Sequence, residues 1–278
     1  MNWPQGRQVA VCLTFDVDAE AGFLGEGPHY AKRLSTLSEG RYGVTRGLPR
    51  ILNMLHQHDI AATFFVPGYT AEIHPEAVQA ILAAGHEVGH HGYLHLRNDR
   101  VSANEQREEI ERGLAALAGA GAPRPVGYRS PAWEMTAETF ELLLEHGFQY
   151  DSSCMGDDRP YLESCNGKQI LELPVHWSLD DWPRFGWSID HGGNVSDVGE
   201  LLRSWETEFQ AARKEKRLVT YTMHPEVIGR AYRVVQLEQL IEKMKLASDV
   251  WFATLAQVAK HTAPQFRDRD EARRPASR

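Results

Sequence analysis

Short runs of β-branched and aromatic residues alternate with longer amphipathic stretches along most of the chain. This alternation is typical of repeated βα units around a parallel sheet or barrel, and we count about seven such units. The sequence therefore predicts an α/β fold. The predicted strands cover residues 8–15, 61–66, 87–90, 126–129, 149–152, 170–175, 218–223 and 251–254.

Signals at the helix ends support this order of elements. Ser102 followed by Glu105 fits a capping box, and Thr136 and Ser196 are expected N-caps before stretches with apolar periodicity. Glycines such as Gly147 follow several of these stretches, and glycine accepts the left-handed conformation of a helix end at little cost. We therefore expect strand and helix to alternate throughout.

The chain shows no repeat of fixed period and no linker rich in proline or serine. We therefore expect a single domain over residues 1–261. Residues 262–278 are dense in arginine, aspartate and glutamate and lack an apolar period. A charged, flexible C-terminal tail is expected there.

Two stretches interrupt the βα rhythm. Residues 19–43 are too many for an ordinary βα connection, and residues 180–195 carry tryptophans among glycine and proline. Long connections in compact domains are commonly lids or binding loops. We expect both stretches to overhang a site at the carboxyl ends of the strands.

Composition excludes several classes of protein. The 278 residues are 42% hydrophobic, which suffices for a sizeable core. The apolar runs are far shorter than the ~20 residues of a membrane span, and a formal net charge of −8 argues against nucleic acid or a membrane as partner.

Three cysteines without CxxC spacing support neither a disulfide framework nor a cysteine zinc site. The first residues lack the pattern of an export signal, so a cytoplasmic protein is expected.

Two carboxylates follow the first predicted strand. Asp16 and Asp18 are separated by one residue, so both project to the same side if the strand continues. Such a pair is costly unless a cation or a proton relieves the repulsion. The alternative interpretation is a solvated strand end or an N-cap, and the pair taken alone favours that alternative.

A histidine cluster lies in and after the third predicted strand, with four histidines in residues 86–95. His91 and His95 are four positions apart, so their rings can converge on one point if the chain forms a helical turn there. With Asp18 they would supply three metal ligands and leave one position for water, as in catalytic zinc sites. His86 and His90 are interpreted as packing groups or as supports of the ligands.

Charged and aromatic residues also follow the later strands. They are Arg129 at the end of the fourth strand, Trp133 and Glu134 after it, Trp177, Asp180, Asp181 and Trp182 after the sixth, and His224 after the seventh. Each is weak evidence alone, since a surface ion pair explains Arg129 equally well. Their concerted placement at the carboxyl ends of predicted strands, where α/β and barrel enzymes carry their sites, predicts one catalytic site.

Five short motifs occur in the order found in the polysaccharide deacetylases with a NodB homology domain, and the chain resembles that family over residues 8–258. The motifs are residues 14–18, 91–95, 129–133, 180–182 and 223–225. The first departs from the family in placing Val17 between two aspartates that are more usually adjacent. The resemblance implies a distorted (β/α)7 barrel.

The resemblance also implies the roles of the site residues. A divalent metal, generally zinc, would be held by Asp18, His91 and His95, with Asp16 as the base and His224 as the acid. We further expect Arg129 to keep Asp16 ionised and either Asp180 or Asp181 to orient His224. The chain is similar to a branch that contains peptidoglycan deacetylases and cyclic imide hydrolases, whose members are often homo-oligomers, so a homo-oligomer is expected.

These observations predict a metal-dependent hydrolase of C–N bonds other than peptide bonds. The expected cytoplasmic location favours a small cyclic imide or amide as the substrate. The alternative is N-deacetylation of a polysaccharide or peptidoglycan, in which case the substrate is an acetylated sugar. A second alternative is a barrel that binds metal or carbohydrate without catalysis. The residues expected to contact the substrate are Phe23, Tyr30, Trp133, Glu134, Trp177 and Trp182.

Overall fold

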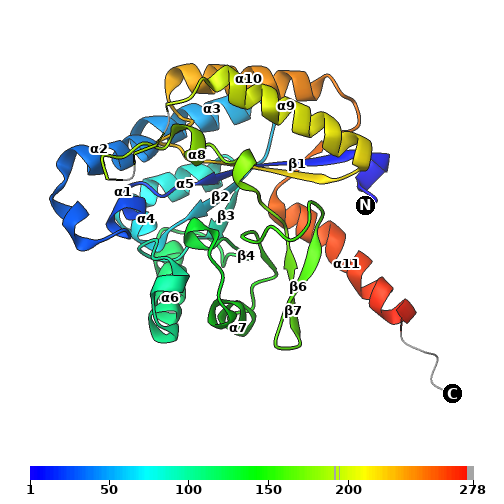
Figure 1. Ribbon diagram of the computed structural model, residues 1–278, viewed down its shortest axis with the longest axis horizontal. Coiled ribbons are helices and arrows are strands. Elements are labelled where there is room, and N and C mark those ends of the chain that lie inside the picture. Colours follow the sequence, from blue (N-terminus) through cyan, green and yellow to red (C-terminus); the bar gives the residue numbers. More distant parts are fainter. Residues whose placement is uncertain (191, 194, 274–278) are drawn as a thin grey trace.

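The computed structural model describes residues 1–190, 192–193 and 195–273. Within these residues, seven parallel strands form a curled sheet in the order β7-β5-β4-β3-β2-β1-β8 (Figure 1). Strand β6 pairs antiparallel with β7, and β9 pairs parallel with β1. The strands are β1 (Val9–Asp16), β2 (Thr63–Val66), β3 (Glu87–His90), β4 (Gly127–Tyr128), β5 (Tyr150–Asp151), β6 (Tyr161–Cys165), β7 (Lys168–Glu172), β8 (Leu218–Met223) and β9 (Val250–Phe252).

Helices cover the outside of the sheet, with α3, α9 and α10 along one side in Figure 1. The α-helices are α1 (Glu20–Leu24), α2 (Leu34–Tyr42), α3 (Leu48–His58), α4 (Gly68–Ile73), α5 (Pro75–Ala83), α6 (Ala103–Gly119), α7 (Ala137–Glu145), α8 (Trp182–Phe185), α9 (Val198–Glu215), α10 (Ala231–Lys245) and α11 (Leu255–Arg273). In the described part of the chain, no helix is both long enough and apolar enough to span a bilayer.

A bridge joins the two ends of the curled sheet. Asp180, in the segment that follows β7, pairs in parallel with Thr222 of β8. The ends of the sheet therefore meet where the strands end, which is where a barrel enzyme carries its site. The predicted fold, a distorted (β/α)7 barrel, is confirmed in its class.

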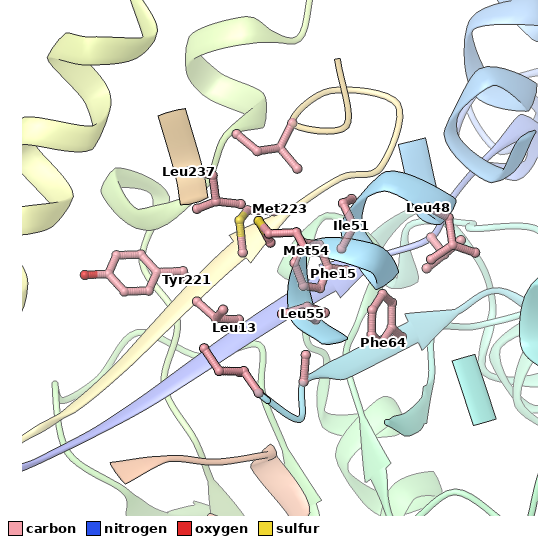
Figure 2. Close-up of a cluster of buried hydrophobic side chains, with 14 of the residues drawn as sticks. Leu13, Phe15, Leu48, Ile51, Met54, Leu55, Phe64, Tyr221, Met223 and Leu237 are labelled. Atoms are coloured by element: carbon pink, nitrogen blue, oxygen red, sulfur yellow. The ribbon is translucent and has the colours of Figure 1, made fainter. Parts of the chain in front are cut away.

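Alternation along β1 separates the core from the site. Leu13 and Phe15 belong to the large apolar cluster that β1, β2 and β8 form with α3 and α10, and Figure 2 shows Phe15 beside Met54 and Leu13 beside Leu55 of α3. Full burial of such a side chain contributes roughly 1.5–3 kcal/mol. Residues 10 and 12 belong to a second apolar cluster, which contains residues of α11. Because side chains alternate along a strand, this second face also carries residues 14 and 16 toward the end of β1.

The structure corrects several expectations. Residues 19–43 are not a loop, because they form α1, a 3₁₀ segment (Pro28–Lys32) and α2. The hairpin β6–β7 was not predicted; its turn consists of Asn166 and Gly167, both with positive φ (50° and 76°), as tight hairpin turns require.

The C-terminal boundary expected at residue 261 does not coincide with the end of an element. Helix α11 continues to Arg273, Thr262 is fully buried, and Phe266 packs against the second apolar cluster. The remainder of the expected tail, residues 274–278, lies outside the described residues.

The capping predictions can be compared directly with the helix starts. Ser102 caps α6 through a capping box with Glu105, and Thr136 caps α7. The N-cap of α9 is Asp197 in place of Ser196, and the Asp197 side chain accepts a hydrogen bond from the backbone N–H of Glu200. The observed N-cap thus lies one residue after the expected one. Either residue type can cap a helix, because a carboxylate accepts hydrogen bonds from the free N–H groups of a helix start as well as a hydroxyl does.

Candidate active site

One cavity at the carboxyl ends of the strands collects most of the residues singled out from the sequence. Arg129 and Asp181 lie fully buried behind its wall, whereas Glu134 is exposed and is not part of the lining. Glu134 was therefore wrongly predicted to face the cavity. The lining consists of Asp16, Asp18, Gly22, Phe23, Glu26, Tyr30, His91, His95, Ala132, Trp133, Trp177, Asp180, Trp182, Ser188, His224 and Glu226.

Three potential metal ligands meet at the base of this cavity. Asp18 Oδ1 lies 3.4 Å from His91 Nε2, and Asp18 Oδ2 lies 3.4 Å from His95 Nε2. Neighbouring ligands of a tetrahedral ion with bonds of about 2.0–2.2 Å are about 3.3–3.6 Å apart. Asp18 Oδ1 is buried and has no hydrogen-bond partner. The spacing, the unpaired oxygen and the ligand chemistry all fit a divalent metal such as zinc.

The chain reaches this arrangement by a bend and not by the helical turn expected from the spacing of the histidines. His91 directly follows β3, Gly92 has φ +69°, and His95 has φ +60°. A positive φ is unusual for a residue other than glycine and is found mainly where surrounding structure imposes it. The bend turns both Nε2 atoms toward Asp18.

Burial and neighbouring charge shape the protonation of these groups. Burial lowers the pKa of His91, with His95 adding to the shift, which favours the neutral ring that binds metals. Burial opposes ionisation of Asp18, but the adjacent His95 and His91 outweigh it and lower the pKa of this carboxyl. A carboxylate beside two imidazole rings is a donor set that holds divalent metals.

Asp16 forms a buried ion pair with Arg129. The guanidinium Nη1 lies 2.7 Å from Asp16 Oδ1 and also donates to Thr14 Oγ1 at 2.9 Å. Its other nitrogens donate to the carbonyl oxygen and the hydroxyl of Ser152, both at 3.0 Å. The second oxygen of Asp16 lies 3.8 Å from His91 Nε2. Arg129 thus fixes Asp16 beside the three potential ligands without itself entering the cavity.

His224 lies on the opposite wall, directly after β8. Its Nδ1 is 2.7 Å from Asp181 Oδ1 and 3.7 Å from Asp180 Oδ1, so Asp181 is the residue that orients the ring. The backbone N–H of His224 also donates to Asp181 Oδ2, at 3.1 Å. The Nε2 atom faces the cavity and lies 3.9 Å from Asp18 Oδ2.

The electrostatics of this wall favour a charged imidazole. Burial alone would lower the pKa of His224, but Asp181 and Asp180 outweigh it and raise this pKa well above its usual value. Burial raises the pKa of Asp180 to about 7, although His224 opposes the shift. His224 is therefore suited to donate a proton at neutral pH.

Aromatic rings form the outer wall. Trp133 and Trp177 stack with centroids 4.1 Å apart, and Trp177 is 41% exposed at the mouth. Trp182 packs against His224 at 5.3 Å and Phe23 lies next to Trp182 at 6.4 Å. The predicted aromatic residues Phe23, Tyr30, Trp133, Trp177 and Trp182 all line the cavity.

Sequence reasoning missed some of the cavity. Gly22, Glu26, Ala132 and Ser188 line it but carry no pattern that distinguishes them from loop residues. Glu226 is different, since it is a carboxyl residue that follows β8 and His224, which is the same signal that identified the other site residues.

The chain is similar to known proteins in both sequence and fold. The chain matches the polysaccharide deacetylase family over residues 5–150. It is 30% identical to a peptidoglycan deacetylase from Helicobacter pylori over 286 aligned residues, covering 91% of this chain and 96% of that protein. A crystal structure of a Mycobacterium smegmatis protein assigned to the polysaccharide deacetylases superimposes with a TM-score of 0.92 at 40% identity, over 95% of this chain and 93% of that one.

The fold is shared more widely. PuuE allantoinase has a TM-score of 0.83 at 23% identity, over 94% of this chain and 92% of that one. The family assignment made from the motifs is confirmed by the closer matches, and this protein belongs to the polysaccharide deacetylase family.

Proposed function

We propose that this protein is a metal-dependent hydrolase that removes the acetyl group from an N-acetylated sugar, as in peptidoglycan or a related polysaccharide. The observation that carries the proposal is the convergence of Asp18, His91 and His95 beside Asp16 and His224. The name of the Helicobacter pylori relative supports this substrate over the cyclic imide that we favoured from the sequence.

Asp18, His91 and His95 would hold the metal. When bound, a divalent metal supplies Lewis acidity that makes water a better nucleophile and polarises a substrate carbonyl. The residues of the chain perform the proton transfers. Asp16, held by Arg129, accepts the proton of the attacking water as its oxygen bonds to the acyl carbon.

His224 completes the reaction. As the C–N bond breaks, its Nε2 proton passes to the departing nitrogen, and the negative charge of Asp181 stabilises the imidazolium beforehand. The stacked Trp133 and Trp177 present an apolar face at the mouth, on which a sugar ring can pack. The products are a free amine and a carboxylic acid.

A second candidate, hydrolysis of a compact cyclic imide or amide, is favoured by a contact beside the cavity. Tyr30 donates a hydrogen bond to Asp190 Oδ2 at 2.7 Å, and Arg33 pairs with the same carboxylate. This contact ties the segment that follows β1 to the segment that follows α8. Two segments held together beside the cavity favour a small ring or a chain end over the middle of a polymer.

The test is one panel of substrates assayed on protein of measured metal content. The panel contains N-acetylated amino sugars, chitooligosaccharides, ureides and cyclic imides. We expect cleavage of at least one N-acetylated sugar, loss of activity on chelation and recovery with zinc. Full activity after exhaustive chelation would overturn the metal-dependent scheme, and activity confined to imides would replace the first candidate by the second.

A further inference from the structure

Glu226 is a buried carboxyl in the cavity wall that the proposed reaction does not use. It lies in the turn after β8, where the carbonyl oxygen of His224 accepts hydrogen bonds from the backbone N–H groups of Val227 and Ile228, both at 2.8 Å. Its exposed fraction is 2%, and it lines the same cavity as Asp18 and His224. The turn therefore fixes Glu226 and His224 together on one wall.

One oxygen of the Glu226 carboxyl lacks the hydrogen-bond partner that normally stabilises a buried acid. Its Oε2 has no hydrogen-bond partner, and the nearby His224 is the group whose positive charge favours its ionised form. A buried polar atom without a partner costs about 1–3 kcal/mol. Burial, together with the negative charge of Asp18, raises the pKa of Glu226 well above its usual value. Stability does not account for a carboxyl at this position.

The packing around Glu226 depends on Gly43. A Cβ atom at position 43 would lie 2.7 Å from Glu226 Oε2 and 3.0 Å from its backbone nitrogen, which is too close for real contacts. Gly43 therefore provides the space that the carboxyl occupies. Two other acids of this wall have partners: Asp16 pairs with Arg129, and Asp180 accepts a hydrogen bond from the backbone N–H of Trp182 at 2.7 Å. Asp18 Oδ1, like Glu226 Oε2, has none, but Asp18 is a potential metal ligand.

We propose that Glu226 determines specificity by accepting a hydrogen bond from the N–H group of the scissile amide, and so selects N-acyl over O-acyl substrates. The inference rests on the proposed hydrolase function. His224 is the proton donor to the leaving atom, and Glu226 is fixed on the same wall by the turn that both share. Charged or neutral, a carboxyl keeps an oxygen lone pair that can accept this bond.

An ester offers no hydrogen at the corresponding position. The ester oxygen would leave the Glu226 carboxyl unpaired and would face it with its own lone pairs. Sites built to hydrogen-bond an N–H or O–H group reject analogues that lack it far more strongly than apolar pockets distinguish shapes. Glu226 thus adds discrimination that the metal ligands, Asp16 and His224 do not provide.

The experiment compares a matched amide and ester, p-nitroacetanilide and p-nitrophenyl acetate, through the ratio of their kcat/KM values. The variants are Glu226→Leu, which removes the acceptor, and Glu226→Gln, which keeps a carbonyl acceptor. Glu108→Leu makes the same change at an exposed position on α6 and serves as the control. Glu226→Met replaces Glu226→Leu if the latter does not fold.

We expect the amide-to-ester ratio to fall at least about tenfold in Glu226→Leu, as loss of one hydrogen bond to a buried carboxyl implies, and to stay within about threefold of wild type in the Gln and Glu108 variants. An unchanged ratio, or equal losses for both probes, overturns the role of Glu226. If chelation still abolishes activity in that case, the proposed hydrolase function stands. A wild-type protein that cleaves neither p-nitroacetanilide nor any N-acetylated sugar overturns both.

Discussion

The Nδ1 atom of His91 lies 2.7 Å from the backbone carbonyl oxygen of Arg129. Because a carbonyl oxygen only accepts hydrogen bonds, Nδ1 must carry the proton. The lone pair of Nε2 therefore points toward Asp18. The side chain of the same arginine pairs with Asp16. Arg129 therefore orients a potential metal ligand through its backbone and the proposed base through its guanidinium.

Replacement of Asp16 separates the base from the metal site. In Asp16→Asn we expect metal content to remain at the wild-type level, while kcat falls by roughly 10²- to 10⁴-fold, the usual contribution of a general base. Metal analysis and steady-state assays on the same preparation check this. Loss of the metal together with activity would show that Asp16 is a ligand and not the base.

Removal of Arg129 tests its ion pair with Asp16. Arg129→Met leaves a buried carboxylate without its cation, which typically costs about 3–5 kcal/mol of unfolding free energy. The double variant Arg129→Met with Asp16→Asn should recover part of that loss, because the uncompensated charge is gone. Denaturant unfolding of the two single variants and the double variant measures the coupling, and strictly additive effects would contradict a direct pair.

The pH dependence of turnover tests the proton donor. Asp181 and Asp180 raise the pKa of His224 and so keep it protonated as the pH rises. In Asp181→Asn that pKa should fall, and the alkaline limb of the kcat profile should move to lower pH. Asp180→Asn should move it less, because its oxygen is 3.7 Å from Nδ1 while that of Asp181 is 2.7 Å away. An alkaline limb that both variants leave in place would exclude His224 as the acid.

Stability should depend on pH through Glu20 and His74, whose side chains are 2.9 Å apart between α1 and the end of α4. The hydrogen bond to Glu20 raises the pKa of His74, so its contribution is complete below the ordinary value of 6.5 and is lost as the pH rises through the higher folded-state value. Burial opposes ionisation of Glu20, but His74, with a backbone hydrogen bond and Arg41, outweighs it and lowers this pKa, so the contribution of Glu20 is complete above 4.5 and is lost on acidification.

The difference in Tm between wild type and His74→Gln should therefore be largest between about pH 4.5 and 6.5 and should shrink on either side. Thermal unfolding at several pH values checks this, with His56→Gln, at an exposed position of α3, as the control. A difference that does not vary with pH would mean that the pair contributes no charge interaction.

Much of the fold follows from local pattern. The alternation in β1 separates core residues such as Phe15 from site residues such as Asp16, and the same period places the later strands. The hairpin β6–β7 carried a recognisable signal in Asn166-Gly167, a dipeptide typical of tight turns. It was missed because β6 is only partly buried and does not show an apolar run, whereas β7 overlaps the strand predicted over residues 170–175.

The site was predictable where chemistry-bearing residues directly follow strands. Sequence spacing could not show that His91 and His95 converge through a bend. The bend depends on positive φ angles at Gly92 and His95, and surrounding structure imposes the one at His95. Nor could it choose between Asp180 and Asp181, which are adjacent in the sequence. In the structure, Asp181 Oδ1 lies 2.7 Å from His224 Nδ1, whereas Asp180 Oδ1 lies 3.7 Å from it. Glu134 was misplaced for the same reason, since the turn after Trp133 directs it to solvent.

The most direct test of the account is zinc binding by wild type and by Asp18→Ala, measured by calorimetry and elemental analysis, with Asp99→Ala at an exposed position as the control. We predict one zinc ion per chain in wild type and in the control, and loss of both zinc and turnover in Asp18→Ala. Zinc binding and activity that survive in Asp18→Ala would contradict a metal centre formed by Asp18, His91 and His95.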